Sequence, residues 1–436
     1  MQVPEDVLRP RIPFRKEVFG GLAYDESNET FCYLRKADYE VLQCLDTSDI
    51  PEDATFSPKL DAELAYLKRF GLTHATSDPS RMHRGSLKHD RDGLLSAPTI
   101  LILYPNFTCN ERCEFCFVGN EVEQARHDDI LPPSQIATFA DRVTASGVFN
   151  VEVLGGEPFL YHSLDVLLDE LGARGLDLNV STNGTVHSQK YLDAIVRNKV
   201  KLNIALHGPT QEVHDGITRS RSFDKVVEFV KLSHASGIGT HVTMVLHPQN
   251  LDSVDRTVDF LAGLGVKKMT LSYPHPFEYT VRHRALVPFD QYVALFRKAG
   301  EVGRAVGVHV NGNCHYNLVL DEFKTAFDAT NPLAKYLYGG KSGRSRLEMT
   351  PSGDLYASAA MFGKPEWKVG NLFTEDLLDS WINSPVLKRI RERPLPKTCR
   401  DCAHETVCGG GVISPMLVQD RWDEPPDDCP VVTDLV

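Results

Sequence analysis

The stretch TCNERCEFCF, residues 108–117, contains three cysteines, Cys109, Cys113 and Cys116. A disulfide uses two cysteines and a structural zinc site uses four ligands, so three clustered thiols leave one coordination place open. Thiolates hold iron–sulfur clusters, and three of them on a short loop can bind three irons of a cubane and leave the fourth exchangeable. A zinc site completed by a distant histidine, or three buried free thiols, are the alternatives.

A second group of cysteines lies near the C-terminus, in the pattern CxxCxxxxxC followed by one more. Its members are Cys399, Cys402, Cys408 and Cys429. Four thiolates can close one 4Fe–4S cluster, and they can equally hold a structural zinc ion. The remaining cysteines stand alone, at Cys32, Cys44 and Cys314. Buried, inert thiols are the expectation for these three.

Composition restricts the kind of protein. The chain has 436 residues, which is enough for two or three domains, and a formal net charge of −12. This acidic balance argues against a nucleic-acid or anionic-membrane binder. No apolar run is long enough to span a bilayer, and the first residues lack the apolar core of a secretory signal. We therefore expect a cytoplasmic protein, where clustered cysteines serve as metal ligands rather than disulfides.

Strand-like and helix-like runs alternate through the middle of the chain, which predicts a parallel sheet. The six strand-like runs are at 99–104, 150–155, 177–182, 201–206, 240–246 and 267–273. We interpret 98–310 as an α/β domain, a partial (β/α)6 TIM-like barrel. The three-cysteine loop follows its first strand, at the end where such barrels carry their chemistry.

The two ends of the chain follow other patterns. Residues 1–75 predict a hairpin and two amphipathic helices, one at 36–46 and one that begins at 59 and is ended by Gly71, in a small winged-helix-like domain. Residues 76–97 are polar and lack periodicity, which is typical of a linker. Residues 311–436 form an irregular domain, with a hairpin predicted in TPSGDLYASAAMFG.

The three-cysteine loop, with Phe115 before its last cysteine, resembles the signature of the radical S-adenosylmethionine (radical SAM) superfamily. The resemblance extends to GGEP at 155–158, STNG at 181–184 and ALHGPTQEVHDGITRSRSFD at 205–224, each after a predicted strand. It implies a SAM-binding 4Fe–4S cluster that generates a 5′-deoxyadenosyl radical. It also implies SAM contacts at Phe115, Gly155, Gly156, Glu157, Pro158, Ser181, Asn183 and Arg219. Arg219 stands where glycine is common, and Thr218 stands where an arginine often contacts SAM.

The C-terminal cysteines and their CGGG sequence resemble the SPASM domain of radical SAM enzymes, a domain that binds auxiliary iron–sulfur clusters. Ser358 and Val412 occupy positions where ligands of a first auxiliary cluster are expected. The resemblance therefore implies one auxiliary 4Fe–4S cluster, held by Cys399, Cys402, Cys408 and Cys429.

Residues 1–75 resemble the recognition element of ribosomal-peptide maturases, a domain related to the pyrroloquinoline-quinone peptide chaperone. Such a domain binds a leader peptide as an added strand. The combined resemblance implies an enzyme that cross-links, epimerises or excises residues of a ribosomally made precursor peptide. It would need an electron donor such as flavodoxin or ferredoxin. A folding cap on the barrel is the alternative for these residues.

The catalytic residues are not evident from the sequence. Cys314 and Tyr273 are weak candidates, as a radical relay and as a residue at a strand end, and His275, His315 and Tyr316 could line the substrate pocket. Two other functions compete. One is a radical SAM/SPASM oxidoreductase acting on a folded protein, as sulfatase maturases do, or on a small molecule. The other is a redox-sensing regulator, against which the acidic balance and the intact GGEP argue.

Overall fold

The computed structural model describes residues 14–25, 30–36, 95–314, 316, 337, 339–419, 421–422, 424–426 and 429–432. The two helices predicted before residue 76, most of the predicted linker, Cys44 and His315 lie outside these residues, as does the side chain of Cys32. The boundaries predicted for the N-terminal domain and linker therefore stay predictions.

A large sheet confirms the predicted α/β barrel. Its strand order is β10-β9-β8-β7-β6-β5-β4-β11-β12-β13, and the eight strands from β10 to β11 are mutually parallel. The first seven in chain order are β4 (Ile100–Leu103), β5 (Asn150–Val153), β6 (Asp177–Thr182), β7 (Lys201–Ala205), β8 (Thr240–Val245), β9 (Lys268–Ser272) and β10 (His309–Asn313). The sixfold strand–helix alternation read from the sequence is thus correct. β10 adds a seventh barrel strand, which crosses the boundary predicted at residue 310.

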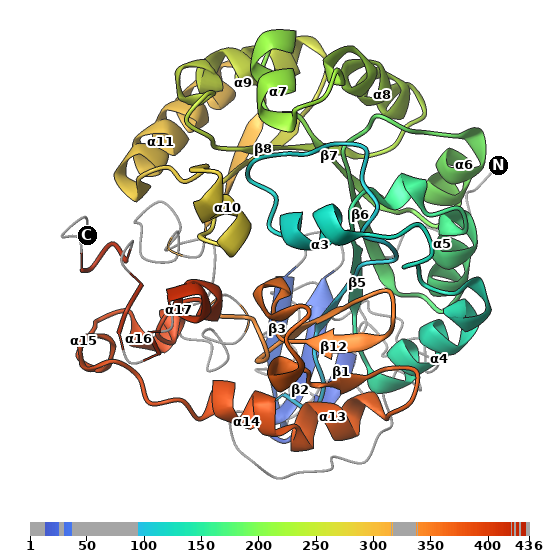
Figure 1. The fold of residues 1–436 in the computed structure, drawn as a ribbon, viewed down its shortest axis with the longest axis vertical. Coiled ribbons are helices and arrows are strands. Elements are labelled where there is room, and N and C mark those ends of the chain that lie inside the picture. The colour runs from blue at the N-terminus through green and yellow to red at the C-terminus, as the bar shows by residue number, and fades with distance from the viewer. Residues whose placement is uncertain are drawn as a thin grey trace, which may run out of the picture.

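Helices cover the outer face of this sheet, as Figure 1 shows. The helices between consecutive barrel strands are α4 (Ile136–Ser146), α5 (Leu164–Ala173), α6 (Gln189–Arg197), α8 (Phe223–Ala235), α9 (Val254–Gly263) and α11 (Phe289–Val306). Each turns its apolar residues to the sheet, which is the amphipathic pattern that predicted them. Three shorter helices lie in the loops after the strands: α3 (Gly119–Gln124), α7 (Gln211–Thr218) and α10 (Glu278–Arg282).

The C-terminal part continues the barrel sheet. β11 (Arg346–Met349) pairs in parallel with β4, and it forms the predicted hairpin with β12 (Asp354–Tyr356), which pairs with β13 (Gly370–Asn371). Its helices are α13 (Leu377–Asn383), α14 (Pro385–Arg391), α15 (Lys397–Arg400), α16 (Glu405–Cys408) and α17 (Ile413–Gln419). The buried Trp381 donates from its indole to the carbonyl of Leu95 at 2.7 Å. Shared strands and this contact fix the C-terminal part against the barrel.

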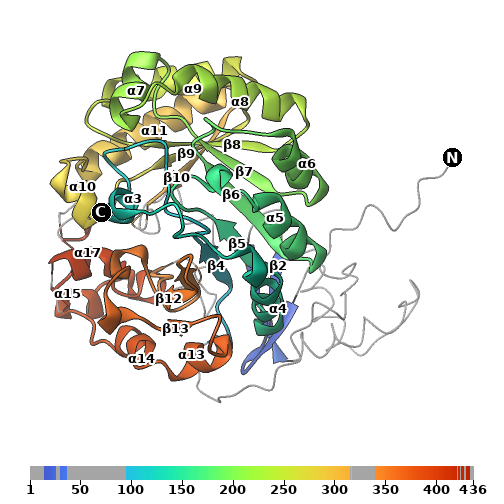
Figure 2. The same cartoon turned by 45° about the vertical axis from the view of Figure 1, so that its right-hand side comes forward.

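A separate antiparallel sheet lies near the N-terminus, with the order β1-β2-β3. Its strands are β1 (Phe14–Glu17), β2 (Gly20–Asp25) and β3 (Thr30–Arg35). The sequence predicted the β2–β3 hairpin and missed β1. The four residues of β1 contain one apolar side chain, Phe14, and three charged ones, so they show no alternation that would indicate a strand. Figure 2 shows this sheet beside β4, β5 and α4 of the barrel.

Small polar side chains link neighbouring barrel strands. Asn203 on β7 donates to Ser181 on β6 at 3.2 Å and accepts from Thr243 on β8 at 2.8 Å. These three residues are half-buried, while their strand neighbours Val180, Leu202 and Ile204 are fully buried against the helices. The alternation of half-buried polar and fully buried apolar residues along these strands gives the inside of the barrel a polar surface.

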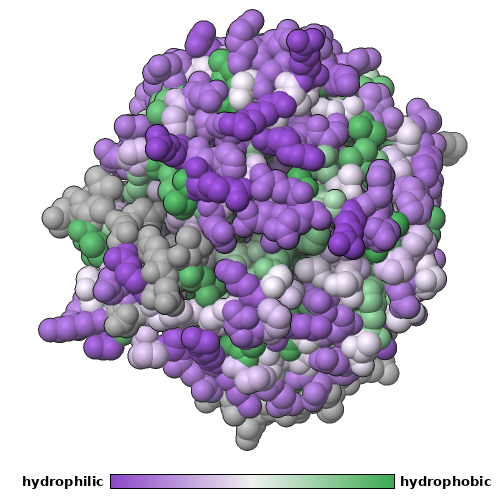
Figure 3. All heavy atoms as spheres, viewed as in Figure 1, coloured by the Kyte–Doolittle hydropathy of each residue, from purple (hydrophilic) through white to green (hydrophobic). Residues whose placement is uncertain are grey.

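The outer surface in the view of Figure 3 is largely hydrophilic, with small hydrophobic areas, one of them near its centre. Among the residues that the structure describes, no helix is both long and apolar enough to cross a membrane.

Candidate functional site

The loop that carries the three clustered cysteines connects β4 to α3, at the carboxyl end of the barrel. All three thiols are half-buried and none forms a disulfide. The loop is held by the end of α7, because the backbone N–H groups of Arg112 and Glu114 donate to the carbonyls of Thr218 and Ile217 at 3.0 and 3.3 Å. The structure thus places Cys109, Cys113 and Cys116 where the strand-end argument predicted.

Burial makes these thiols weak acids. It raises the pKa of Cys109 and of Cys116 to about 12, and it raises the pKa of Cys113 well above its usual range. Without a metal the thiols are therefore protonated at neutral pH, and a cationic iron–sulfur core is needed to hold them as thiolates. Three such thiols on one loop fit the ligand set of a SAM-binding cluster.

The GGEP loop lies directly against the cysteine loop. The N–H of Gly156 donates to the carbonyl of Asn106 at 3.0 Å, and the N–H of Glu157 donates to that of Thr108 at 2.8 Å. A Cβ atom added to Gly156 would lie 2.2 Å from the Thr108 carbonyl oxygen, and one added to Gly155 would lie 2.7 Å from that of Asn106. The glycines are required here because two backbones meet without room for a side chain.

Glu157 is fully buried and its carboxylate has three donors. Oε1 accepts from the N–H of Phe159 at 2.9 Å and from the hydroxyl of Thr182 at 2.7 Å, and Oε2 accepts from the N–H of Asn183 at 2.8 Å. Burial raises its pKa to about 7 in spite of these hydrogen bonds. The carboxylate therefore joins GGEP to the STNG segment at the end of β6. The SAM contact that the resemblance implies for Glu157 stays a prediction beside these three hydrogen bonds.

Asn183 links this pair of loops to the cysteines. Its side-chain amide donates to Oδ1 of Asn110 at 2.9 Å and lies 3.9 Å from the Cys109 sulfur. Pro158 is buried at the start of a short 3-10 helix, Pro158–Leu160, and Ser181 faces the inner surface of the barrel through its bond to Asn203. The structure thus gathers Gly155, Gly156, Glu157, Pro158, Ser181 and Asn183 around the cysteine loop.

Arg219 and Phe115 lie on the α7 side of the cysteine loop. Arg219 is half-exposed and its guanidinium pairs with the carboxylate of Glu114, which also lies 3.1 Å from Nε2 of His247. Its φ of 53° is left-handed, which explains in physical terms why glycine suits this position. The ring of Phe115 packs edge-on against the ring of His207, with the two ring centroids 4.5 Å apart. Arg219 supports the cysteine loop here, and its assignment to SAM binding stays a prediction.

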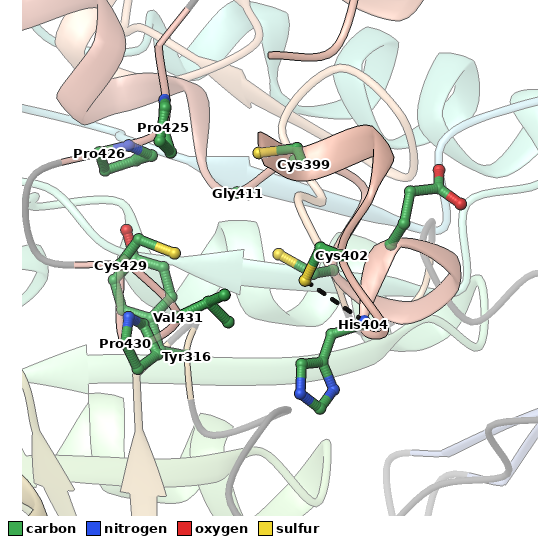
Figure 4. A pocket seen from close by; sticks show the side chains of 13 residues that line it. Tyr316, Cys399, Cys402, His404, Gly411, Pro425, Pro426, Cys429, Pro430 and Val431 are labelled. Atoms are coloured by element: carbon green, nitrogen blue, oxygen red, sulfur yellow. Dashed lines mark hydrogen bonds between the residues drawn. The ribbon is translucent and has the colours of Figure 1, made fainter. Parts of the chain in front are cut away.

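The four C-terminal cysteines line one recess of about 420 Å³, a volume that includes the solvent space to which it opens. In Figure 4 the sulfurs of Cys399, Cys402 and Cys429 face this shared space, and the ring of Tyr316 lies beside Cys429. The fourth, Cys408, ends α16, and burial raises its pKa to about 11. Cysteines separated by up to 30 positions in the sequence therefore meet in one place, which fits the ligand set of one closed cluster.

Ser358, which stands where a ligand of a first auxiliary cluster is expected, is buried beside Ser414. The two hydroxyl oxygens are 2.8 Å apart. The side chains of Met361, Ile413 and Met416 are buried as well. A serine hydroxyl offers no thiolate to a cluster, and the absence of a first auxiliary site stays a prediction.

The weak catalytic candidates lie in an aromatic group beside β9. Tyr273 is buried, and its ring centroid lies 5.4–5.9 Å from those of His275, Phe289 and Tyr292. Its backbone N–H donates to the carbonyl of Asn313 at 3.0 Å. Cys314 is buried directly after β10, as an inert thiol would be. Among the described residues, no group of three or more His, Cys, Asp or Glu side chains is arranged to hold a single metal ion. Ligation by the seven clustered cysteines stays a prediction.

The sequence interpretation missed Glu114, Thr182, Asn183 as a link between loops, and Arg393, described below. Glu114 lies between Cys113 and Cys116, and this position in the cysteine loop was the one sign in the sequence that it belongs to the site. Thr182 lies inside the quoted STNG segment. Their partners, however, come from loops 25 to 105 positions away, and spacing along the chain does not report such contacts.

A parallel partial barrel, three thiols after its first strand, an adjoining GGEP loop and a thiol-lined recess in a second domain together define a radical SAM enzyme with an auxiliary iron–sulfur domain. Comparison with known families agrees. The radical SAM superfamily matches residues 103–261, and SPASM, an iron–sulfur cluster-binding domain, matches residues 341–403. The chain thus contains a radical SAM domain and a SPASM domain, which imply SAM, a 4Fe–4S cluster and auxiliary iron–sulfur clusters as cofactors.

Individual proteins are similar over most of the chain. The subtilosin biosynthesis protein AlbA of Bacillus subtilis is 23% identical over 69% of this chain and 64% of its own length. The matched segment thus spans less than two thirds of AlbA. The mycofactocin maturase MftC of Mycolicibacterium smegmatis is 24% identical over 73% of this chain and 79% of its own. The crystal structure of Streptococcus suis SuiB bound to S-adenosylmethionine has a TM-score of 0.79 at 21% identity, covering 98% of this chain and 100% of SuiB.

Proposed function

We propose that this enzyme modifies a ribosomally made precursor peptide, which it binds through a leader segment at its N-terminal domain. The functions of similar proteins support this proposal: AlbA serves subtilosin biosynthesis, MftC is a mycofactocin maturase, and SuiB has been crystallised with its precursor peptide SuiA. The reaction outcome, whether cross-link, epimerisation or excision, is left open by the residues of the site.

The observation that carries the proposal is the docked β1–β3 sheet. The buried guanidinium of Arg15 donates to the carbonyls of Ala97, Pro98 and Gly147 at 2.8–3.1 Å, and Tyr24 donates to Asp177 on β6 at 2.7 Å. Among the described residues β3 pairs only with β2, so no strand is paired with its other edge. A strand edge fixed to the barrel suits an extended peptide that adds a strand and passes its following residues to the site.

The residues of the site position the reactants. Glu157 locks the GGEP and STNG loops together, and the cysteine loop rests on both, so the three loops form one rigid support. When bound, the SAM cluster and SAM supply the radical that abstracts a substrate hydrogen. The inner strand surface, with Ser181, Asn203 and Thr243, offers polar contacts to a peptide backbone.

We infer that one auxiliary 4Fe–4S cluster is held by Cys399, Cys402, Cys408 and Cys429. With four thiolates no iron is left open for substrate, so this site suits electron transfer or structural support. An electron acceptor near the substrate favours net two-electron oxidations, such as cross-linking or desaturation. A flavodoxin-like or ferredoxin-like protein would supply the reducing electrons, in a reducing cytoplasm where the thiols stay free.

The test is leader dependence. Holoenzyme with both clusters loaded is incubated with SAM, a reductant and a candidate precursor peptide, with and without its leader segment. The proposal expects a mass change only in the peptide that has its leader, while SAM cleavage proceeds with both. Equal modification of both peptides would refute leader binding. No mass change in either peptide would favour the alternative, a folded-protein or small-molecule substrate.

A further inference from the structure

The segment after Cys408 is a tight loop of three glycines. Gly409, Gly410 and Gly411 all have left-handed φ values, 63°, 82° and 82°. Two arginines hold the outer side of this loop. Arg344 donates to the carbonyl of Gly409 at 3.1 Å, and Arg393 donates to that of Gly410 at 2.8 Å. The loop therefore presents its carbonyl oxygens to buried positive charge.

The same loop borders the recess that the four cysteines line. Gly409 directly follows Cys408, and Gly410 and Gly411 line the recess together with the cysteines. The two arginines and the glycine loop thus form one unit beside the Cys408 sulfur.

Arg393 is unusual among the buried cations. It is only 8% exposed, its Nε has no hydrogen-bond partner, and it pairs with no carboxylate among the residues that the structure describes. Burial lowers its pKa to about 10, so the guanidinium stays charged at neutral pH, and Cys399 and Cys408 are the acidic groups that act on it. A buried cation without a counter-ion is unfavourable, because the charge loses its hydration without gaining a partner.

We propose that Arg393 is a positioning residue of the auxiliary site: its guanidinium holds the Cys408–Gly411 loop and offsets the negative charge of the iron–sulfur cluster, which raises the reduction potential of that cluster. This inference rests on the proposed ligation by Cys399, Cys402, Cys408 and Cys429.

The sign of the effect follows from charge. Four thiolates more than balance the charge of a 4Fe–4S core, so the loaded site is anionic and gains one more negative charge when it takes up an electron. A fixed cation close by stabilises the reduced state more than the oxidised state. Removing the charge of Arg393 should therefore make the site harder to reduce, whereas the SAM-binding site at the barrel mouth should be unaffected.

The experiment is a redox titration of the holoenzyme with dithionite as the one-electron donor, followed by electron paramagnetic resonance. Added SAM identifies the signal of the SAM-binding cluster, which serves as an internal reference. The variants are Arg393→Met, which removes the charge, and Arg393→Lys, which keeps it. Arg400→Met, at an exposed arginine next to Cys399, is the matched control for loss of charge near the site.

The proposal expects a lower potential for the auxiliary signal in Arg393→Met, restoration by Arg393→Lys, and little change in Arg400→Met or in the reference signal. Loss of one cluster's iron from Arg393→Met but not from Arg393→Lys would also support it. Unchanged potentials in loaded Arg393→Met, equal shifts in Arg400→Met, or loss of the cluster from both Arg393 variants would overturn it. If the enzyme without substitutions binds iron for only one cluster, the auxiliary site itself is overturned. If the potentials are as expected but the peptide is not modified, only the proposed function is refuted.

Discussion

The carboxylate of Glu157 accepts a hydrogen bond from the backbone N–H of Asn183 at 2.8 Å, and this contact joins the loops after β5 and β6 beneath the cysteine loop. GGEP and STNG are thus one structural unit rather than two separate binding motifs. Asn183 extends the unit to Cys109, whose sulfur lies 3.9 Å from its side-chain amide. A change at Glu157 should consequently disturb the stability of the site as well as SAM binding.

Glu157→Gln should lower the free energy of unfolding by about 2 kcal/mol, because one of three buried donors then faces an amide N–H₂ group. Urea titration of the iron-free chain measures the difference. The matched control is Glu170→Gln, which alters a partly exposed helical pair with Arg174 and should cost at most about 0.5 kcal/mol. Equal effects of the two substitutions would show that the buried link contributes nothing.

The same pair of proteins should show a pH dependence of known sign. The pKa of Glu157 is about 7 in the folded chain, against 4.5 for an ordinary glutamate, the value that we take for the unfolded chain. Between these two pH values the folded chain binds a proton at Glu157 that the unfolded chain has released. Stability therefore falls as pH rises through this window, and glutamine does not titrate. The stability advantage of the unmodified chain over Glu157→Gln should shrink from pH 5 to pH 8. An advantage that grows over this range would contradict the raised pKa.

Arg219 offers a test that separates a backbone effect from a ligand contact. Arg219→Gly should be close to neutral for stability, since relief at a φ of 53° offsets the loss of a half-exposed ion pair with Glu114. Arg219→Ala loses the pair without the relief and should be about 1 kcal/mol less stable than Arg219→Gly. Calorimetric SAM titration of the two loaded variants decides the role of the side chain. An equal, large loss of SAM affinity in both would establish direct contact with SAM.

The two cysteine groups should lose iron independently. Cys116→Ala should remove the iron of one cluster, abolish SAM cleavage and leave the auxiliary signal intact. Cys429→Ala should remove the other cluster and keep the SAM-dependent signal. Iron and sulfide analysis with electron paramagnetic resonance checks both. Cys314→Ala is the control and should keep the iron of both clusters, because this buried thiol lies outside both groups. Loss of iron from Cys314→Ala would make it a replacement ligand.

Arg15 should hold the N-terminal sheet on the barrel. Arg15→Met removes three hydrogen bonds to backbone carbonyls on the barrel side and leaves the Glu17 carboxylate without its guanidinium partner, which should cost about 3–5 kcal/mol. Hydrogen exchange of β1–β3 should become faster, while exchange in β7–β9 stays unchanged. The neighbouring Lys16 is exposed, so Lys16→Met should leave the exchange of the sheet as it is. Unchanged exchange in Arg15→Met would mean that other contacts fix the sheet.

The barrel was predictable from the sequence because its signals are local. Each strand is a short apolar run, each helix has one apolar face, and both periodicities can be read along the chain. The cysteine groups were equally visible, since their spacing is short. Strand β1 of the N-terminal sheet and the extension of the barrel by β11 were not visible. Strand β1 lacks an alternating pattern, and the pairing of β11 with β4, as between Glu348 and Ile102, joins residues far apart in sequence.

The same reason explains which parts of the site escaped prediction. Gly155 and Gly156 were correctly singled out, but their reason is the approach of the Asn106–Thr108 backbone, which only the fold reveals. The hydrogen bonds that Glu157 accepts from Thr182 and Asn183, at the end of β6, were not predicted, and its contact with SAM stays a prediction. Arg393 belongs to no motif, and its burial with an unpartnered Nε among the described residues becomes apparent only in three dimensions.

The measurement that tests the central claim most directly is the mass of a precursor peptide expressed together with the enzyme. The candidate is a short reading frame beside the gene, expressed with cluster-loaded enzyme and, in parallel, with Cys116→Ala. The account predicts a defined mass change, or solvent deuterium incorporation in the case of epimerisation, that is absent with Cys116→Ala. An unchanged peptide in cells where both clusters are loaded would contradict it.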